Sequence, residues 1–152
     1  MNKIPIDKET ILKRINGIQG EISELEKIAK IQFEEFKDGV GFKLTQYHLH
    51  RVLEGVFHIG SHILSRIPGA QATEYKEIAK KLGEYGIIDK KYAGSVLVKM
   101  AGYRNRLVHF YAEIIPEEIY KIINENLGDF DIFLKAVRKI LSNPEKFNLT
   151  IQ

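Results

Sequence analysis

Residues 7–29, DKETILKRINGIQGEISELEKIA, carry the clearest helical pattern in the sequence. The apolar residues recur at spacings of four and three, at Ile11, Ile15, Ile18, Ile22, Leu25 and Ala29. This period places them in one core-facing stripe of an α-helix. Asp7 is suited to cap the start, because its carboxylate can accept hydrogen bonds from the first unpaired N–H groups. We expect a long helix whose stripe continues to Phe33 and Phe36.

The remainder of the chain shows further helical periodicity and no strand-like alternation. After turn residues at 38–41, we predict helices over about 45–67, 73–82 and 89–114, and a last segment over 116–141 that is interrupted near Gly128. Pro116 suits the first position of a helix, since its missing N–H would have no partner there. The sequence therefore predicts an all-α fold, a largely up-and-down bundle of four to five helices forming a single domain over residues 1–152.

Composition excludes several classes of protein. The chain has 152 residues, 44% of them hydrophobic and 28% charged, which is typical of one globular domain. It contains no cysteine, so disulfides, thiolate nucleophiles and cysteine-based zinc sites are excluded. No apolar run approaches the roughly 18 residues that span a bilayer, and the N-terminal residues lack a signal-peptide core. We expect a cytoplasmic protein without a membrane partner.

The predicted fourth helix carries two apolar faces. One holds Val96, Met100, Tyr103, Leu107 and Phe110, and the other holds Leu97, Val98, Ala101, Val108 and Ala112 with Asn105 among them. Two buried faces need two partners. We infer that one partner is the helix's own bundle and the other a second copy of the chain, since most soluble oligomers are two-fold dimers. The alternative is that this helix is simply the centre of a monomeric bundle.

Residues 103–111, YRNRLVHFY, hold the groups best suited to chemistry. An imidazole titrates near neutrality and can move a proton, and a guanidinium can hold a phosphate and stabilise its transition-state charge. His109 and Arg104 can thus cleave an RNA phosphodiester without a metal, with Asn105 orienting either group. They lie about 140° apart on a straight helix, so their convergence needs a bend at Gly102 or a two-fold mate.

Positive charge gathers around these residues. Although the net charge of the chain is only +3, residues 89–112 carry five cations against the single acid Asp89. An anionic partner should therefore bind this segment, and we predict that Lys99 and Arg106 contact RNA. We expect no DNA partner.

The string Arg104-Asn105, three residues, then His109-Phe110-Tyr111 resembles the Arg-Asn-x3-His motif of the HEPN superfamily with the His-x-Tyr ending of HepT-like toxins. The order of helices is similar over nearly the whole chain. The resemblance implies a HEPN-like homodimer whose motif lines a cleft between subunits, with Arg104 and His109 as catalytic residues of a metal-independent endoribonuclease. No cofactor is implied.

The same resemblance implies a partner. HepT-like toxins pair, in a type VII-like toxin–antitoxin system, with an MntA-like nucleotidyltransferase antitoxin that adenylylates the motif tyrosine, here Tyr111. Such a group would add negative charge and bulk beside Arg104, where RNA phosphate is expected to bind. The alternative for Tyr111 is an unmodified, half-buried helix residue.

The predicted second helix supplies further candidates, a polar stripe of Arg51, Glu54, His58 and His62. The HEPN family often has an acidic residue at the place of Glu54, which implies that this carboxylate orients a catalytic group. The stripe can instead be a solvated face, or Glu54, His58 and His62 can hold a metal, since residues four apart share a helix face. His48 and His50 are expected at the surface.

Two other functions remain open. The chain can be a non-catalytic HEPN subunit that binds RNA or nucleotide for a minimal nucleotidyltransferase, or a purely structural helical adaptor. Gly39 and Gly41 lack the third glycine of a dinucleotide fingerprint, and the chain has neither a phosphate-binding P-loop nor a Gly-x-Ser-x-Gly nucleophile motif. Nucleotide-dependent chemistry by the chain itself and a serine nucleophile are therefore unsupported.

Overall fold

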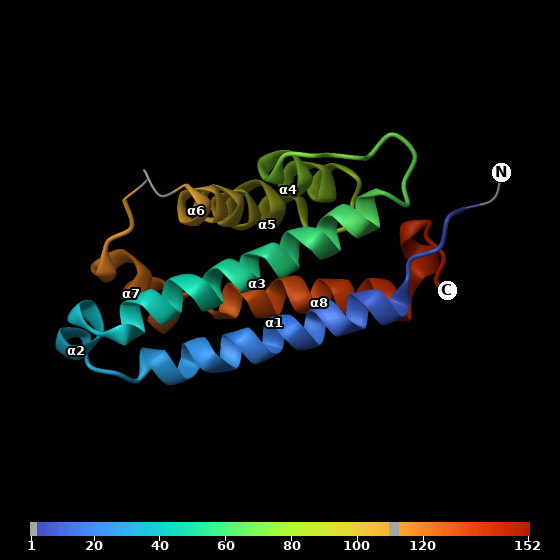
Figure 1. The fold of residues 1–152 in the computed structure, drawn as a ribbon. Helices are drawn as coiled ribbons and strands as arrows, with labels where there is room; N and C mark the ends of the chain where they lie inside the picture. The colour runs from blue at the N-terminus through green and yellow to red at the C-terminus, as the bar shows by residue number, and fades with distance from the viewer. Residues whose placement is uncertain (1–2, 110–112) are drawn as a thin grey trace.

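The computed structural model describes residues 3–109 and 113–152, whose regular structure is helical except for one isolated bridge between Ile6 and Ile151 (Figure 1). The helices are α1 (Lys8–Ala29), α2 (Phe33–Asp38), α3 (Val40–Leu64), α4 (Tyr75–Glu84), α5 (Lys90–Tyr92), α6 (Val98–Val108), α7 (Pro116–Glu125) and α8 (Gly128–Ser142). A π-helical turn, η1 (Ala93–Leu97), joins α5 to α6, and a 3-10 turn, η2 (Pro144–Phe147), follows α8. The predicted all-α bundle is confirmed.

Helices α1 and α3 form a long antiparallel pair, and α4 and α6 pack on the opposite side of α3 from α1 (Figure 1). The predicted stripe of α1 is buried from Ile11 to Leu25. Asp7 caps the helix as predicted, because its Oδ1 accepts a hydrogen bond from Thr10 N at 3.1 Å. Since α3 contacts helices on both sides, its middle turns can hold residues that face several elements.

The prediction of a first helix continuing to Phe36 was wrong. The chain leaves the helix after Ala29 and starts α2 at Phe33, which turns the ring of Phe36 back into the core, 4.9 Å from that of Tyr120. The predicted turn at 38–41 reduces to Gly39, where an added Cβ would lie 2.8 Å from Glu35 O. This close approach lets α3 begin at Val40, earlier than predicted, and α3 ends at Leu64 rather than Ile67.

The predicted fourth helix is interrupted and shorter. It starts at its cap Asp89, whose Oδ2 accepts from Tyr92 N at 3.0 Å, but a π-helical turn at Ala93–Leu97 shifts its register. It ends at Val108 rather than Ile114, with Glu113 and Ile114 outside any helix. His109 is the cap residue, with extended backbone angles of φ −93° and ψ 104°. Its direction is therefore not set by the helical wheel.

The assignment of two separate faces to this helix was also wrong. Leu97 and Ala101 of one predicted face and Met100 of the other are all buried within the chain's own bundle. Val108, at the end of the helix, is 39% exposed. The second apolar face therefore gives less support to a dimer than the sequence suggested.

The C-terminal third agrees with prediction. Pro116 begins α7, and the helical structure is interrupted before Gly128, the first residue of α8. Helix α8 buries Phe130, Phe133 and Val137. The segment just before α1 pairs with the C-terminal residues, because Ile6 N donates to Thr150 O at 2.8 Å and Gln152 N to Ile6 O at 2.9 Å. Among the residues described, no helix is long and apolar enough to cross a membrane.

Candidate functional site

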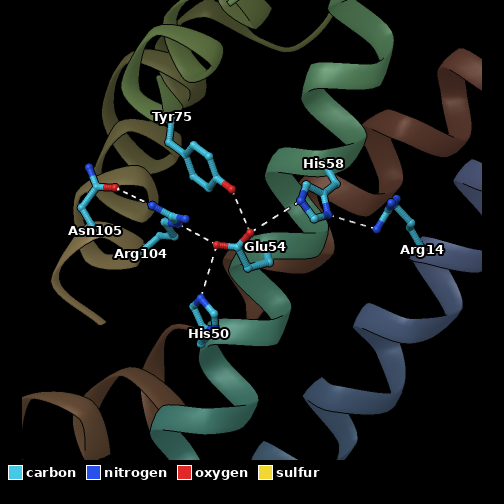
Figure 2. Close-up of polar contacts among 7 residues, drawn as sticks. All are labelled: Arg14, His50, Glu54, His58, Tyr75, Arg104 and Asn105. Carbon is cyan, nitrogen blue, oxygen red and sulfur yellow. Dashed lines mark hydrogen bonds and ion pairs between the residues drawn. The ribbon is translucent and has the colours of Figure 1, made fainter. Parts of the chain in front are cut away.

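The carboxylate of Glu54, in the middle of α3, is the centre of a polar cluster (Figure 2). Arg104 Nε donates to Glu54 Oε1 at 2.6 Å, and Tyr75 Oη donates to Glu54 Oε2 at 2.8 Å. His50 Nε2 lies 3.3 Å from Oε1 and His58 Nε2 3.6 Å from Oε2. One acid therefore connects side chains from α3, α4 and α6.

Helix geometry explains how these groups meet. His50, Glu54 and His58 are spaced by four residues, so each imidazole lies one turn from the carboxylate on the same face of α3. Tyr75 is the first residue of α4, which packs closely on α3 at Gly60, where an added Cβ would lie 2.9 Å from Leu82 Cδ1. Glycine at this position therefore lets α4 approach α3 closely, since a larger residue would have to displace the Leu82 side chain.

The guanidinium of Arg104 is held on several sides. Its Cζ lies 4.0 Å from the centroid of the Tyr75 ring, a cation–π contact, and its Nη1 donates to Asn105 Oδ1 at 3.2 Å. The side chain is 23% exposed. Within the described part of the chain, its polar contacts use Nε and Nη1, so the Nη2 donors of the planar fork are not engaged by these residues.

The electrostatics keep Glu54 ionised. Burial by itself would raise the pKa of Glu54, but the hydrogen bonds from Arg104 and Tyr75 outweigh it and lower that pKa below its ordinary value. Burial and the bond to Glu54 raise the pKa of Tyr75, so its hydroxyl stays protonated as a donor. At neutral pH the pair of Glu54 and Arg104 is therefore a charged ion pair, in which the carboxylate offsets part of the cation's charge.

Comparison with known proteins identifies the family. Residues 18–137 match the family described as Ribonuclease HepT-like, which is most of the chain and includes Glu54, Tyr75, Arg104 and His109. The chain belongs to the HepT-like ribonuclease family. The resemblance to HepT-like members of the HEPN superfamily is thereby confirmed.

Individual known proteins are also similar to this HepT-like chain in sequence or in fold. It is 25% identical over 144 residues to the tRNA nuclease HepT of Aphanizomenon flos-aquae (strain 2012/KM1/D3), covering 94% of this chain and 97% of the relative. A Shewanella oneidensis HEPN toxin, solved tri-AMPylated and in complex with an MNT antitoxin, shares the fold with a TM-score of 0.77 and 22% identity, over 85% of this chain and 96% of the toxin. The structure of YutE from Bacillus subtilis, a cytosolic protein of unknown function, is similar with a TM-score of 0.76 and 20% sequence identity. The match covers 91% of this chain and 93% of YutE.

The predicted site residues of the HepT-like chain fall in three places. Arg104, Asn105 and Glu54 are brought together, while His109 is exposed just past the end of α6, its N–H bonded to Asn105 O at 3.1 Å. Lys99 and Arg106 line a different cavity, of about 840 Å³, between α3, α6, α7 and α8. Tyr111 lies outside the described residues.

Arg106 forms an ion pair that the sequence analysis did not predict. Its guanidinium forms an ion pair with Glu118 of α7, and its Nη2 donates to Glu113 O at 2.7 Å. Arg106 therefore joins α6 to α7 across the intervening residues, and part of the positive charge of segment 89–112 is balanced by Glu118 and by Glu54. RNA binding by Lys99 and Arg106 stays a prediction.

Sequence reasoning missed three members of the cluster. Tyr75 was counted only as an apolar helix residue, His50 as a surface residue, and Arg14, whose Nη1 lies 3.0 Å from His58 Nδ1, was not considered. The four-residue spacing to Glu54 was a signal for His50. Nothing in the sequence pairs the helices of Tyr75 and Arg14 with α3.

The alternative of a metal held by Glu54, His58 and His62 does not fit the geometry. His62 Nε2 accepts a hydrogen bond from Asp7 N at 3.1 Å, at the start of α1, while Glu54 is engaged by Arg104 and Tyr75. Residues 3–109 and 113–152 contain no group of three acidic or histidine side chains arranged to hold a metal ion.

Proposed function

We propose that this HepT-like protein is a metal-independent endoribonuclease, the toxin of a toxin–antitoxin pair, acting in the cytoplasm. The observation that carries the proposal is the guanidinium of Arg104, fixed by Glu54, Tyr75 and Asn105 five residues before His109 in the family's motif. A pre-oriented guanidinium stabilises transition-state charge on a phosphate without the cost of reorganising at the moment of reaction. Membership of the HepT-like ribonuclease family supports the same activity.

The reaction needs one proton carrier and one anion holder. His109 takes the proton of a ribose 2′-hydroxyl, and the 2′-oxygen then attacks the adjacent phosphorus. The bond from phosphorus to the 5′-oxygen breaks, and the imidazolium returns its proton to that oxygen. Arg104 binds the non-bridging oxygens throughout, so the products are a 2′,3′-cyclic phosphate and a 5′-hydroxyl end.

The active unit is a homodimer in this proposal, with the motif in a cleft between two copies. Exposed apolar side chains on α3, Val40 at 68% and Leu44 at 42%, together with Val108 at the end of α6, support a partner of this kind. Apolar groups at such exposure are stabilised when a second copy covers them. Because His109 lies beyond the helix, it can act with Arg104 of its own chain or of the second copy.

The proposed antitoxin is an MntA-like nucleotidyltransferase that adenylylates Tyr111. The tyrosyl oxygen attacks the α-phosphorus of ATP, pyrophosphate leaves, and AMP stays attached to the toxin. The added phosphodiester brings negative charge and bulk seven residues after Arg104, which opposes the binding of RNA phosphate. The likeness in fold to a tri-AMPylated HEPN toxin supports this regulation.

One assay tests the nuclease. The purified chain is incubated with total RNA in excess chelator, beside Arg104→Ala, His109→Ala and Arg138→Ala, the last being an exposed arginine on α8. We expect cleavage by the wild type and by Arg138→Ala, none by the other two, and none of an oligonucleotide with 2′-deoxyribose at the cut site. Cleavage that survives in His109→Ala, or that needs added metal, contradicts the proposal.

A second candidate is a non-catalytic subunit that binds RNA or nucleotide for its nucleotidyltransferase. The ion pair favours it, because Glu54 offsets the charge that Arg104 would offer to a reacting phosphate. Binding without cleavage in the same assay supports this candidate. For Tyr111, coexpression with a neighbouring nucleotidyltransferase gene and intact-mass measurement decide: an adenylyl mass gained by the wild type and lost in Tyr111→Phe is expected, and no gain rejects the modification.

A further inference from the structure

A groove between α1 and α3 opens beside Glu54, on the α1 side of the cluster shown in Figure 2. Its volume is about 610 Å³, and the side chains that matter here are Lys13, Arg14, Tyr47, His50, Arg51 and His58. Glu54 lines the groove and also binds Arg104 on α6. The groove is therefore connected to the proposed reacting centre through a single carboxylate.

Small residues shape the groove. Gly55 of α3 packs directly on α1, since an added Cβ would lie 2.6 Å from Ile18 Cγ1, and this contact closes the floor. Gly17 of α1 has open space instead, with nothing within 4 Å of an added Cβ. The two helices therefore touch at the bottom while the upper part stays accessible to a ligand.

The acids that line the groove are already paired with other residues, so more of its positive charge is available to a ligand than its composition suggests. Its acids are Glu21 and Glu54, and both are already bound: Glu21 to Arg51 at 2.7 Å and to His48, and Glu54 to Arg104 and Tyr75. Among the described residues, the one ion pair of Lys13 is a solvent-exposed contact with Glu9 at 3.6 Å, which is worth little in water. Lys13 and Arg14 are therefore the cations that an anionic ligand would meet.

Arg14 is also connected to the cluster. Its Nη1 lies 3.0 Å from His58 Nδ1, and since a guanidinium can only donate, Nδ1 must accept. The proton of His58 is then on Nε2, the atom that lies 3.6 Å from Glu54 Oε2. Arg14, His58 and Glu54 thus form a chain of contacts from the groove toward Arg104.

An aromatic side chain completes the groove. Tyr47 is 56% exposed, and Arg51 Cζ lies 5.5 Å from the centroid of its ring. Proteins that bind single-stranded nucleic acids commonly use exposed aromatic rings beside cations, because any unpaired base has a face that can stack on such a ring. A base-paired duplex presents no such face, so the combination favours an unpaired strand.

We propose that the α1–α3 groove binds single-stranded RNA next to the cut site, with Arg14 and Lys13 on a backbone phosphate and Tyr47 stacked on a base. This inference rests on the proposed function, since it supplies the substrate class of the same site. The groove holds the strand while Arg104 and His109 act on a neighbouring phosphate.

The test measures binding separately from cleavage. A fluorescent, fully 2′-O-methylated RNA oligomer has no 2′-hydroxyl nucleophile, so fluorescence anisotropy over a range of salt gives binding alone. We expect Arg14→Ala to raise the Kd several-fold at low salt and to reduce the slope of log affinity against log salt by about 0.7, the loss of one phosphate contact. Tyr47→Ala should weaken binding with an unchanged slope, and Arg138→Ala should change neither. A duplex of the same sequence should compete poorly.

Three outcomes overturn the proposal. The first is unchanged binding by both Arg14→Ala and Tyr47→Ala while the wild type cleaves RNA, which leaves the nuclease function intact. The second is equal competition by the duplex. The third is conversion of a wild-type dimer to a monomer by Arg14→Glu in light scattering, which would make the groove an interface between copies. Conversely, groove-dependent binding by a chain that never cleaves rejects the nuclease and keeps the groove.

Discussion

Arg104 Nε lies 2.6 Å from Glu54 Oε1, a bond that joins residues 50 apart in the chain and connects α6 to the middle of α3. The pair is neither fully buried nor freely solvated, with the two side chains 23% and 21% exposed. Its geometry fixes the direction of the guanidinium, and its charge balance limits how strongly that guanidinium attracts an anion. Both effects can be measured by changing one charge.

Glu54→Gln keeps the shape of the side chain and removes its charge. We expect kcat for RNA cleavage to fall roughly tenfold or more, since misplacing a positioned group has effects of this size, while KM stays the same or falls because Arg104 gains net charge. Glu24→Gln is the control, a carboxylate of α1 that lies outside the cluster and pairs with Lys27 at 3.3 Å. An unchanged kcat in Glu54→Gln would show that Glu54 does not position Arg104.

Tyr75 contributes a hydroxyl and a ring, and two substitutions separate them. Tyr75→Phe removes the hydrogen bond to Glu54 and should lower the free energy of unfolding by about 1 kcal/mol. Tyr75→Leu also removes the ring under Arg104 and its contact with Phe57, at 5.0 Å between centroids, and should lower it by about 2 kcal/mol or more. Urea denaturation measures both. Equal losses would mean that the ring adds nothing.

The imidazole of His62 should make stability depend on pH. Burial, followed by the charge of Arg66, lowers the pKa of His62 below its ordinary value of 6.5, although Asp7 opposes the shift and Arg14 adds to it. Below pH 6.5, His62 takes up a proton more readily in the unfolded chain than in the folded one. The contribution of His62 to the free energy of unfolding is therefore fully present above pH 6.5 and is lost as the pH falls through the pKa of the folded state. Protonation also ends the acceptance of the hydrogen bond from Asp7 N.

His62→Gln provides the comparison, because an amide oxygen can still accept from Asp7 N and does not titrate. Unfolding free energies measured from pH 7.5 to 5 should fall more steeply for the wild type than for His62→Gln. If the difference between the two proteins is the same at every pH, the protonation of His62 does not affect stability.

Two threonines give opposite expectations for the same substitution. Thr45 is fully buried, and its Oγ1 has no hydrogen-bond partner among the residues described, so Thr45→Val should raise the free energy of unfolding by about 1 kcal/mol. Thr10 Oγ1 donates to Asp7 Oδ2 at 2.8 Å, so Thr10→Val should lower it by about 1 kcal/mol. Chemical denaturation of both variants checks the signs, and a loss in Thr45→Val would show that its hydroxyl is satisfied.

The helices and the motif could be predicted from the sequence alone. The stripe from Ile11 to Leu25 and the caps at Asp7 and Asp89 depend on residues a few positions apart, and such local relationships are visible in a single sequence. The Arg104-Asn105 to His109 string was likewise local, and it led to the family that the comparison with known proteins confirmed. Where the sequence was misleading, at Phe36 and beyond Val108, the apolar pattern continued although the helix did not.

The surroundings of Arg104 depend instead on how the helices pack. Its partner Glu54 and the ring of Tyr75 come from other helices, and the charge of Arg106 is balanced by Glu118 on α7. The same holds for the α1–α3 groove, whose depth depends on the contact of Gly55 with Ile18. Periodicity tells which face of a helix is buried, but the rotation and approach of two packed helices are set by the fit of their side chains, and no local pattern records that fit.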